Sequence, residues 1–328
     1  MRTLLHFLAL PFALIVFLLP DKGVAASSPY VQTTDGLDLN RVRFAISAPP
    51  EFTAQLAQRA TALFAKAGLP PLQSDSPHIP SIATLTLTLD PQPLRSDCLG
   101  HLLYAPSLAL TEPVLIPRNS VIMDNVTWLA HTGAQVRTSV TIADLEHDLE
   151  EFINQFIADY RAANAGSHSS IPGTAPAATD PNTSHPDSAT TAPVALHSDS
   201  ILKALPIDQL QISVSAGRFS HTLTTRALQQ FNNAGLALSP GQHHNGQLTL
   251  GVELIQQPLG DRCAGKILYE SGLYLVEHIQ LTRNPRVSIW SDTWLHETTL
   301  VVAPRSQEQL ESDQDTLLRQ FIDSLKTY

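Results

Sequence analysis

Residues 92–104 have the sequence QPLRSDCLGHLLY, and residues 257–269 have the sequence QPLGDRCAGKILY. Both stretches start with Gln-Pro-Leu, carry a cysteine and a later glycine at the same places, and end with Leu-Tyr. A second matching pair, LFAKAGL at residues 63–69 and QFNNAGL at residues 230–236, has nearly the same separation along the chain. Self-similarity at a fixed period is the signature of a repeated structural unit. The chain is therefore predicted to contain two copies of one module.

The two modules are predicted at residues 37–163 and 205–328. In the first, apolar and polar residues alternate around Leu85, Leu87 and Leu89, which predicts a strand with one face in water. Other apolar residues recur at helical spacing. Applied to both copies, these patterns give the order β-α-β-β-β-α. Each module is predicted to be an α+β unit, with a four-stranded, mostly antiparallel sheet and two helices on one face.

A targeting segment and a linker are predicted around these modules. Residues 1–26 combine Arg2, a long apolar run and small residues near Ala26, which is the layout of a secretory signal peptide. The alternative is a retained membrane anchor, but the run is shorter than the roughly 20 residues that a spanning helix needs. Residues 164–204 are rich in Pro, Ser, Thr and Ala, so they are predicted to form a disordered linker. No stretch after the signal peptide predicts a transmembrane segment.

The overall charge excludes one class of partner. The 328 residues include 20 Lys and Arg against 30 Asp and Glu, which gives a formal net charge of −10. Binding to a phosphate backbone requires a basic face, so we predict no nucleic-acid partner. The signal peptide predicts a periplasmic or secreted protein. Its expected partner is another protein or a component of the cell envelope.

Cys98 and Cys263 are the only cysteines, and they occupy equivalent places in the two copies. Because an exported chain meets an oxidising compartment, we predict a disulfide between them. Pairing between two chains and two buried free thiols are the alternatives. His101 gives the first copy a Cys-x-x-His spacing, which could start a metal site, but Lys266 stands at the equivalent place in the second copy. We therefore predict no metal site and no cofactor.

Glu112 and Glu277 are the least ordinary residues of the predicted third strands. Both fall in the inward-facing phase between apolar neighbours, and a buried carboxylate can mark a functional site. They are therefore candidates for buried carboxylates. The alternative is a β-bulge that turns each glutamate outward, which Pro113 favours in the first copy. We prefer the bulge.

Two turns with the same sequence end the predicted third strands. They are Arg118-Asn119 in the first copy and Arg283-Asn284 in the second. Exposed hairpin tips on a rigid sheet are reasonable contact sites, so these four residues are candidates for binding a partner. The simpler interpretation is a soluble turn, since asparagine tolerates the left-handed conformation.

The chain lacks the short motifs of several enzyme classes. It contains no G-x-S-x-G elbow, phosphate-binding loop, dinucleotide fingerprint, H-E-x-x-H or C-x-x-C sequence. Most residues that match between the copies are apolar or glycine, as a scaffold requires. The matching titratable residues that we identify are three pairs: Glu112 and Glu277, Arg59 and Arg226, Arg118 and Arg283.

These observations predict a non-enzymatic binding or adaptor protein with two tandem modules. At the level of architecture alone, the order β-α-β-β-β-α resembles the small periplasmic modules of outer-membrane assembly and transport accessory proteins. That resemblance implies an accessory role in the envelope. Two alternatives remain open. One is a secreted hydrolase that uses a buried glutamate, and the other is a metal or redox protein that uses the loop cysteines.

Overall fold

The computed structural model describes residues 33–70, 83–94, 98–165, 199–202, 204–241, 248–259, 263 and 265–326. We call the described residues up to Ala165 the N-terminal half and those from Asp199 onward the C-terminal half. The elements of the N-terminal half are η1 (Leu39–Arg41), β1 (Val42–Ser47), α1 (Pro50–Lys66), β2 (Ala83–Thr88), β3 (Gln92–Pro93), β4 (Leu102–Tyr104), β5 (Ser107–Ile116), β6 (Val121–His131), β7 (Gln135–Arg137) and α2 (Ile142–Asn164). Those of the C-terminal half are α3 (Asp199–Leu202), η3 (Ile207–Gln209), β8 (Gln211–Ser215), η4 (Gly217–Phe219), α4 (Ser220–Asn233), β9 (Ser239–Pro240), β10 (Thr249–Pro258), β11 (Ile267–Leu281), β12 (Ser288–Val302) and α5 (Gln307–Lys326).

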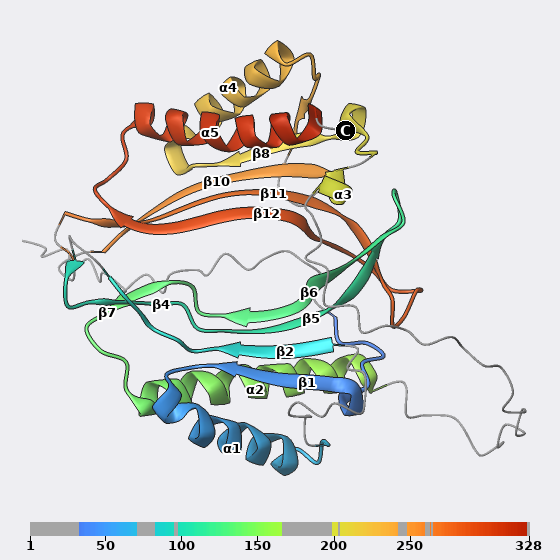
Figure 1. Cartoon of the computed structure of the whole chain (residues 1–328), viewed down its shortest axis with the longest axis vertical. Coiled ribbons are helices and arrows are strands. Elements are labelled where there is room, and N and C mark those ends of the chain that lie inside the picture. Colours follow the sequence, from blue (N-terminus) through green and yellow to red (C-terminus); the bar gives the residue numbers. More distant parts are fainter. Residues whose placement is uncertain are drawn as a thin grey trace, which may run out of the picture.

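Helices form the two outer layers of the molecule, and strands lie between them (Figure 1). In the N-terminal half, β1 pairs with β2 in parallel, and β2, β5 and β6 pair antiparallel in that order. In the C-terminal half, β8 pairs with β10 in parallel, and β10, β11 and β12 pair antiparallel in that order. The expected mixture of helices and a mostly antiparallel sheet is therefore present in both halves. The internal repeat itself stays a prediction.

The sheet is larger than the predicted four strands. It contains nine strands, because β5 also pairs with β11 and so joins the strands of the two halves. The joining contact is short and antiparallel, with Leu115 opposite Gln280 and Val114 opposite Leu281. Two separate four-stranded sheets were therefore the wrong expectation. The two halves share one hydrogen-bonded sheet.

A second, three-stranded sheet in the order β3-β4-β7 was not predicted at all. It forms in the N-terminal half, where Pro91 separates β2 from β3 and Pro106 separates β4 from β5. Proline cannot donate a ladder hydrogen bond, so it is disfavoured inside a paired strand and often marks a strand end or an irregularity. Gln256 and Ser271 stand at the matching places of the C-terminal half, and there β10 and β11 run on without a break.

Each half has its own apolar core between its helices and its strands. In the N-terminal half, Phe64 of α1, Phe156 of α2 and Trp128 of β6 are buried and in edge-to-face contact. In the C-terminal half, Phe231 of α4 and Phe321 of α5 make the same kind of contact. Edge-to-face packing is the favoured arrangement of aromatic rings. The long alternation of apolar residues in the strands supplies the other wall of each core.

Helix α2 begins with a capping box. Asp144 N–H donates to Thr141 Oγ1 (3.3 Å), and Thr141 N–H donates to Asp144 Oδ2 (2.8 Å). The Thr141 side chain also donates to Asp144, and this bond lowers the pKa of the Asp144 carboxyl. The cap fixes where the chain leaves β7 and enters the helix.

Removing this cap should weaken the fold measurably. Thr141→Ala is expected to lower the free energy of unfolding by about 1 kcal/mol, because the first-turn N–H of Asp144 loses its acceptor. Thr141→Ser keeps the hydroxyl and should leave most of the stability. Urea unfolding of both variants beside the wild type gives the comparison. Equal losses in the two variants would contradict the capping role.

The predicted flanking segments lie largely outside the described residues. This holds for the signal peptide at residues 1–26 and for residues 166–198 of the linker. At the end of that predicted linker, Asp199–Leu202 form helix α3, and Ile201 and Leu202 are buried. Ordered structure therefore begins before residue 205. None of the helices in the described ranges has the length and apolar character needed to cross a membrane.

Candidate functional site

The two predicted buried carboxylates meet the two predicted binding arginines where β5 and β11 join. We call this region the junction and define it by Glu112, Arg118, Glu277 and Arg283. Glu112 lies on β5 and Glu277 on β11, whereas the arginines lie just beyond the ends of the same two strands. The junction therefore combines one Glu and one Arg from each half.

Glu112 is only 2% exposed, and both oxygens of its carboxylate accept hydrogen bonds. Arg283 Nε donates to Glu112 Oε2 (2.6 Å), and Thr127 Oγ1 donates to Glu112 Oε1 (2.5 Å). The same guanidinium also donates to the backbone carbonyls of Thr33 (3.1 Å) and Asp35. Arg283 thus binds both a strand and the first described residues of the opposite half.

Glu277 repeats this arrangement with the halves exchanged. It is 3% exposed. Arg118 Nε donates to Glu277 Oε2 (2.5 Å), Arg118 Nη2 donates to Glu277 Oε1 (2.9 Å), and Thr293 Oγ1 donates to Glu277 Oε1. Arg118 also donates to the carbonyl of Ile201 in α3. Each arginine therefore reaches across to the glutamate and to the first residues of the other half.

Both β-bulges exist, but they do not turn the glutamates outward as we had preferred. Along β6 the pairing partner of Leu110 is Trp128 and that of Thr111 is Val126, so Thr127 is the extra residue. The bulge thus sits on β6, and the alternation along β5 continues unbroken through Glu112. On β12 the same irregularity leaves Thr293 as the extra residue. In each half the bulged threonine is the residue that donates to the buried glutamate.

Of the four predicted binding residues, Arg118 and Arg283 belong to the junction, and Asn119 and Asn284 are their neighbours in sequence. The side chains of Arg118 and Arg283 are 15% and 5% exposed. Asn119 Nδ2 donates to the carbonyl of Ile201 (3.3 Å), and Asn284 Nδ2 donates to Asp35 Oδ2 (3.3 Å). These contacts join the two halves, so the four side chains already bind groups of this chain. The argument that exposed hairpin tips bind a partner therefore loses its support. That role stays a prediction.

The hydrogen bonding at the junction limits its chemistry. A general base needs a carboxylate oxygen free to take a proton from a substrate. At Glu112 one oxygen accepts from Thr127 and the other from Arg283, while at Glu277 both oxygens accept from Arg118. Buried ion pairs are stable only when such additional hydrogen bonds satisfy both charges. The arrangement therefore suits a structural lock between the halves.

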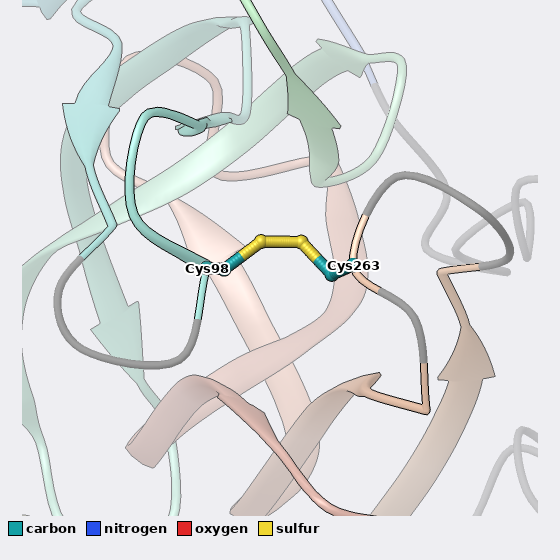
Figure 2. The surroundings of a disulfide bond; sticks show 2 residues. All are labelled: Cys98 and Cys263. Atoms are coloured by element: carbon teal, nitrogen blue, oxygen red, sulfur yellow. A yellow bond between two sulfur atoms is a disulfide. The ribbon is translucent and has the colours of Figure 1, made fainter.

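At the other end of the molecule the halves are joined covalently. Cys98 and Cys263 form the predicted disulfide, with their Cα atoms 5.7 Å apart (Figure 2). Both residues are buried, and Val136 of β7 packs against them. The cysteines are 165 residues apart, the same separation as that of the paired residues Leu115 and Gln280. The halves therefore meet twice through residues at matching positions.

Sequence reasoning missed a further pair of polar contacts, each made by a buried tyrosine. Tyr104 Oη donates to Asp148 Oδ2 (2.6 Å), and Tyr269 Oη donates to Asp313 Oδ2 (2.9 Å). Burial raises the pKa of both tyrosines far above the ordinary value, and the hydrogen bonds to the aspartates raise it further. Arg137 and Arg305 lie over the two rings. The signal was present, because the tyrosines end the matching stretches and each aspartate follows its tyrosine after 44 residues.

Three glutamates of the C-terminal half lie close together around Gly272. In the strand register Gly272 is opposite Glu253 on one side and opposite Glu297 on the other, and Glu270 precedes it by two residues on the same strand. Burial raises the pKa of Glu253, and the charges of Glu297 and Glu270 raise it further. Tyr274 Oη donates to Glu253 Oε1 (3.1 Å).

This raised pKa predicts a pH-dependent effect of Glu253→Gln. The folded chain keeps a proton on Glu253 at pH values where the unfolded chain has lost it, so stability falls as pH rises through that window. At pH 7 the variant should raise the free energy of unfolding, because the neutral amide avoids the cost of ionising a carboxyl in this half-buried, acidic place. Below pH about 4 the gain should vanish. Urea unfolding at both pH values tests this, with the exposed Glu151→Gln as control, and a destabilised variant at pH 7 would contradict it.

Comparisons with known proteins show no family for this chain. No family model matches it, and no curated protein matches it. Among solved structures, the chain is similar to a crystal structure of the rare lipoprotein B from Shewanella oneidensis, with 13% sequence identity. The match covers 35% of this chain and 88% of that chain, with a TM-score of 0.15.

Proposed function

We propose that the chain is a non-enzymatic, two-module binding or adaptor protein of the periplasm or the extracellular space. It acts as an accessory to envelope assembly or transport, and its partner is a protein or another envelope component. The two modules work as one body, because the disulfide and the junction hold them at both ends.

One observation carries the proposal: the charged residues that match between the halves are paired with other protein groups. Glu112 and Glu277 bind the two junction arginines. Arg226 Nη2 lies 2.6 Å from Asp315 Oδ2 between α4 and α5, and Arg59 pairs with Glu150 between α1 and α2. A reaction centre retains polar groups that can reach a substrate. These groups instead hold helices and halves together.

The disulfide supports the location. Both cysteines are buried and bonded to each other across the two halves. Such bonds form and persist in oxidising compartments, which agrees with the predicted signal peptide. Accordingly the mature chain is expected to start at Ala26 or Ser27.

We propose that the partner contacts the face of β6 that carries Ile122 and Val126. Ile122 and Val126 are exposed large apolar side chains on this strand, separated by an exposed acidic residue, Asp124. Exposed apolar side chains that gather in one place mark contact surfaces more often than isolated ones do. Leu300 on β12 is also exposed and serves as a matched control.

The experiment is cross-linking in the envelope of a host that exports the full chain. Wild-type protein should yield a defined cross-linked partner, Ile122→Ser/Val126→Ser should lose it, and Leu300→Ser should keep it. The purified wild type should turn over none of a panel of ester, glycoside and phosphate substrates. A hydrolytic activity that disappears in Glu112→Gln or Glu277→Gln, while the variant stays folded, would overturn the proposal in favour of a hydrolase.

A further inference from the structure

His101 lies beside the disulfide, and its imidazole is a group that can bind a metal ion. The sulfur atoms of Cys98 and Cys263 and one imidazole nitrogen of His101 all lie within 4.8 Å of one another. Tetrahedral Zn²⁺, with bonds of about 2.0–2.3 Å, holds its ligand atoms roughly 3.3–3.8 Å apart. Small side-chain movements therefore suffice to bring these three atoms around one ion.

One nitrogen of His101 lacks a hydrogen-bond partner. Its Nδ1 atom is buried and makes no hydrogen bond. Buried polar atoms without a partner are rare in folded proteins. Its main chain is fixed, because His101 N–H donates to the carbonyl of Cys98 (3.1 Å) and its own carbonyl accepts from Leu94 N–H (2.9 Å). The backbone thus holds this imidazole, with its unpaired Nδ1, beside the two sulfur atoms.

We propose that Cys98, Cys263 and His101 form a Zn²⁺ site that opens when the disulfide is reduced. A dithiol reductant gives two electrons and two protons to the S–S bond, which yields two thiols and leaves the reductant as its own disulfide. Zn²⁺ then binds both sulfurs and the neutral imidazole, and the two thiol protons leave to solvent. A fourth position stays open to water or an outside ligand, as in zinc sites with three protein ligands.

The donor set determines which ions compete for the site. Two thiolates and one imidazole suit Zn²⁺ and Cu⁺, whereas Mg²⁺ and Ca²⁺ require oxygen ligands. Bound Zn²⁺ would replace the disulfide as the cross-link between the halves, because each half supplies one sulfur. This inference goes beyond the proposed adaptor function and does not depend on it.

The test uses the full chain, oxidised or reduced with a phosphine that is removed before titration. Zn²⁺ is titrated against a chromophoric zinc indicator, and native mass spectrometry counts bound ions. The reduced wild type should bind one Zn²⁺ and melt at a higher Tm with Zn²⁺ than without it. The oxidised wild type should show neither effect. Mg²⁺ should not compete.

Variants separate this site from other histidines. His101→Ala should weaken the Zn²⁺ affinity of the reduced chain by more than about tenfold, since even outer-shell changes cost that much. The exposed His147→Ala should leave that affinity unchanged. Equal Zn²⁺ binding by the oxidised and reduced proteins would place the ion elsewhere and overturn the proposal. So would an unchanged affinity in His101→Ala, which removes an imidazole whose buried Nδ1 makes no hydrogen bond.

Discussion

Replacing Cys98 and Cys263 with alanine should lower the free energy of unfolding by about 5 kcal/mol. The bond between Cys98 and Cys263 closes a loop of 165 residues, and this loop includes the end of one half and the start of the other. In the chain-entropy model, a longer closed loop removes more freedom from the unfolded chain. Alanine also avoids leaving a hydroxyl group in a buried place.

Guanidinium chloride unfolding of Cys98→Ala/Cys263→Ala beside the oxidised wild type measures this loss. Reduced wild type, freed of metal by a chelator, should lose a similar amount, because it also lacks the cross-link. The prediction would be contradicted if the oxidised wild type were no more stable than the double variant. The bond would then give no net stabilisation of the fold.

Arg283→Met should lower the free energy of unfolding by about 3–5 kcal/mol, because it leaves Glu112 buried without a charged partner. The variant also removes the donors to the carbonyls of Thr33 and Asp35, so the first described residues lose their attachment. Both side chains of the ion pair are at most 5% exposed. Solvent therefore cannot take over the role of the arginine.

Thermal and urea unfolding give this loss, and Arg59→Met is the matched control. Arg59 also pairs with a glutamate, but its side chain is 50% exposed. Exposed ion pairs contribute little, because water solvates both partners once the pair is broken. Similar losses in the two variants would show that burial does not set the strength of the junction pair.

Much of the fold could be predicted from the sequence, because the matching stretches allow the periodicity of each half to be checked against the other. The leucines at 85, 87 and 89 are buried on β2 as the alternation predicts. The disulfide between Cys98 and Cys263 was also predicted, because these are the only two cysteines and an exported chain meets an oxidising compartment. Local patterns were sufficient wherever one face of an element meets an apolar core.

The junction could not be predicted, because matching residues show what is equivalent and not what is in contact. Glu112 and Arg118 lie six residues apart along the chain, yet each binds a residue of the opposite half. The position of each bulge was also missed, because the sequence of one strand does not show which of two paired strands carries the extra residue. Pro113 pointed to an irregular β5, whereas the extra residue is Thr127 on the neighbouring strand.

The most direct test of the account is a double-mutant cycle between Arg283 and Glu112. Its central claim is that these charges, conspicuous in the sequence, hold the two halves together. The free energies of unfolding of Arg283→Met, Glu112→Leu and the double variant are compared with the wild type. We predict a coupling energy of about 2–3 kcal/mol, which is at the upper end of the range for residues in direct contact. The double variant should be more stable than Arg283→Met, because it leaves no buried charge without a partner. A coupling energy below about 0.5 kcal/mol, the range of independent sites, would contradict the lock.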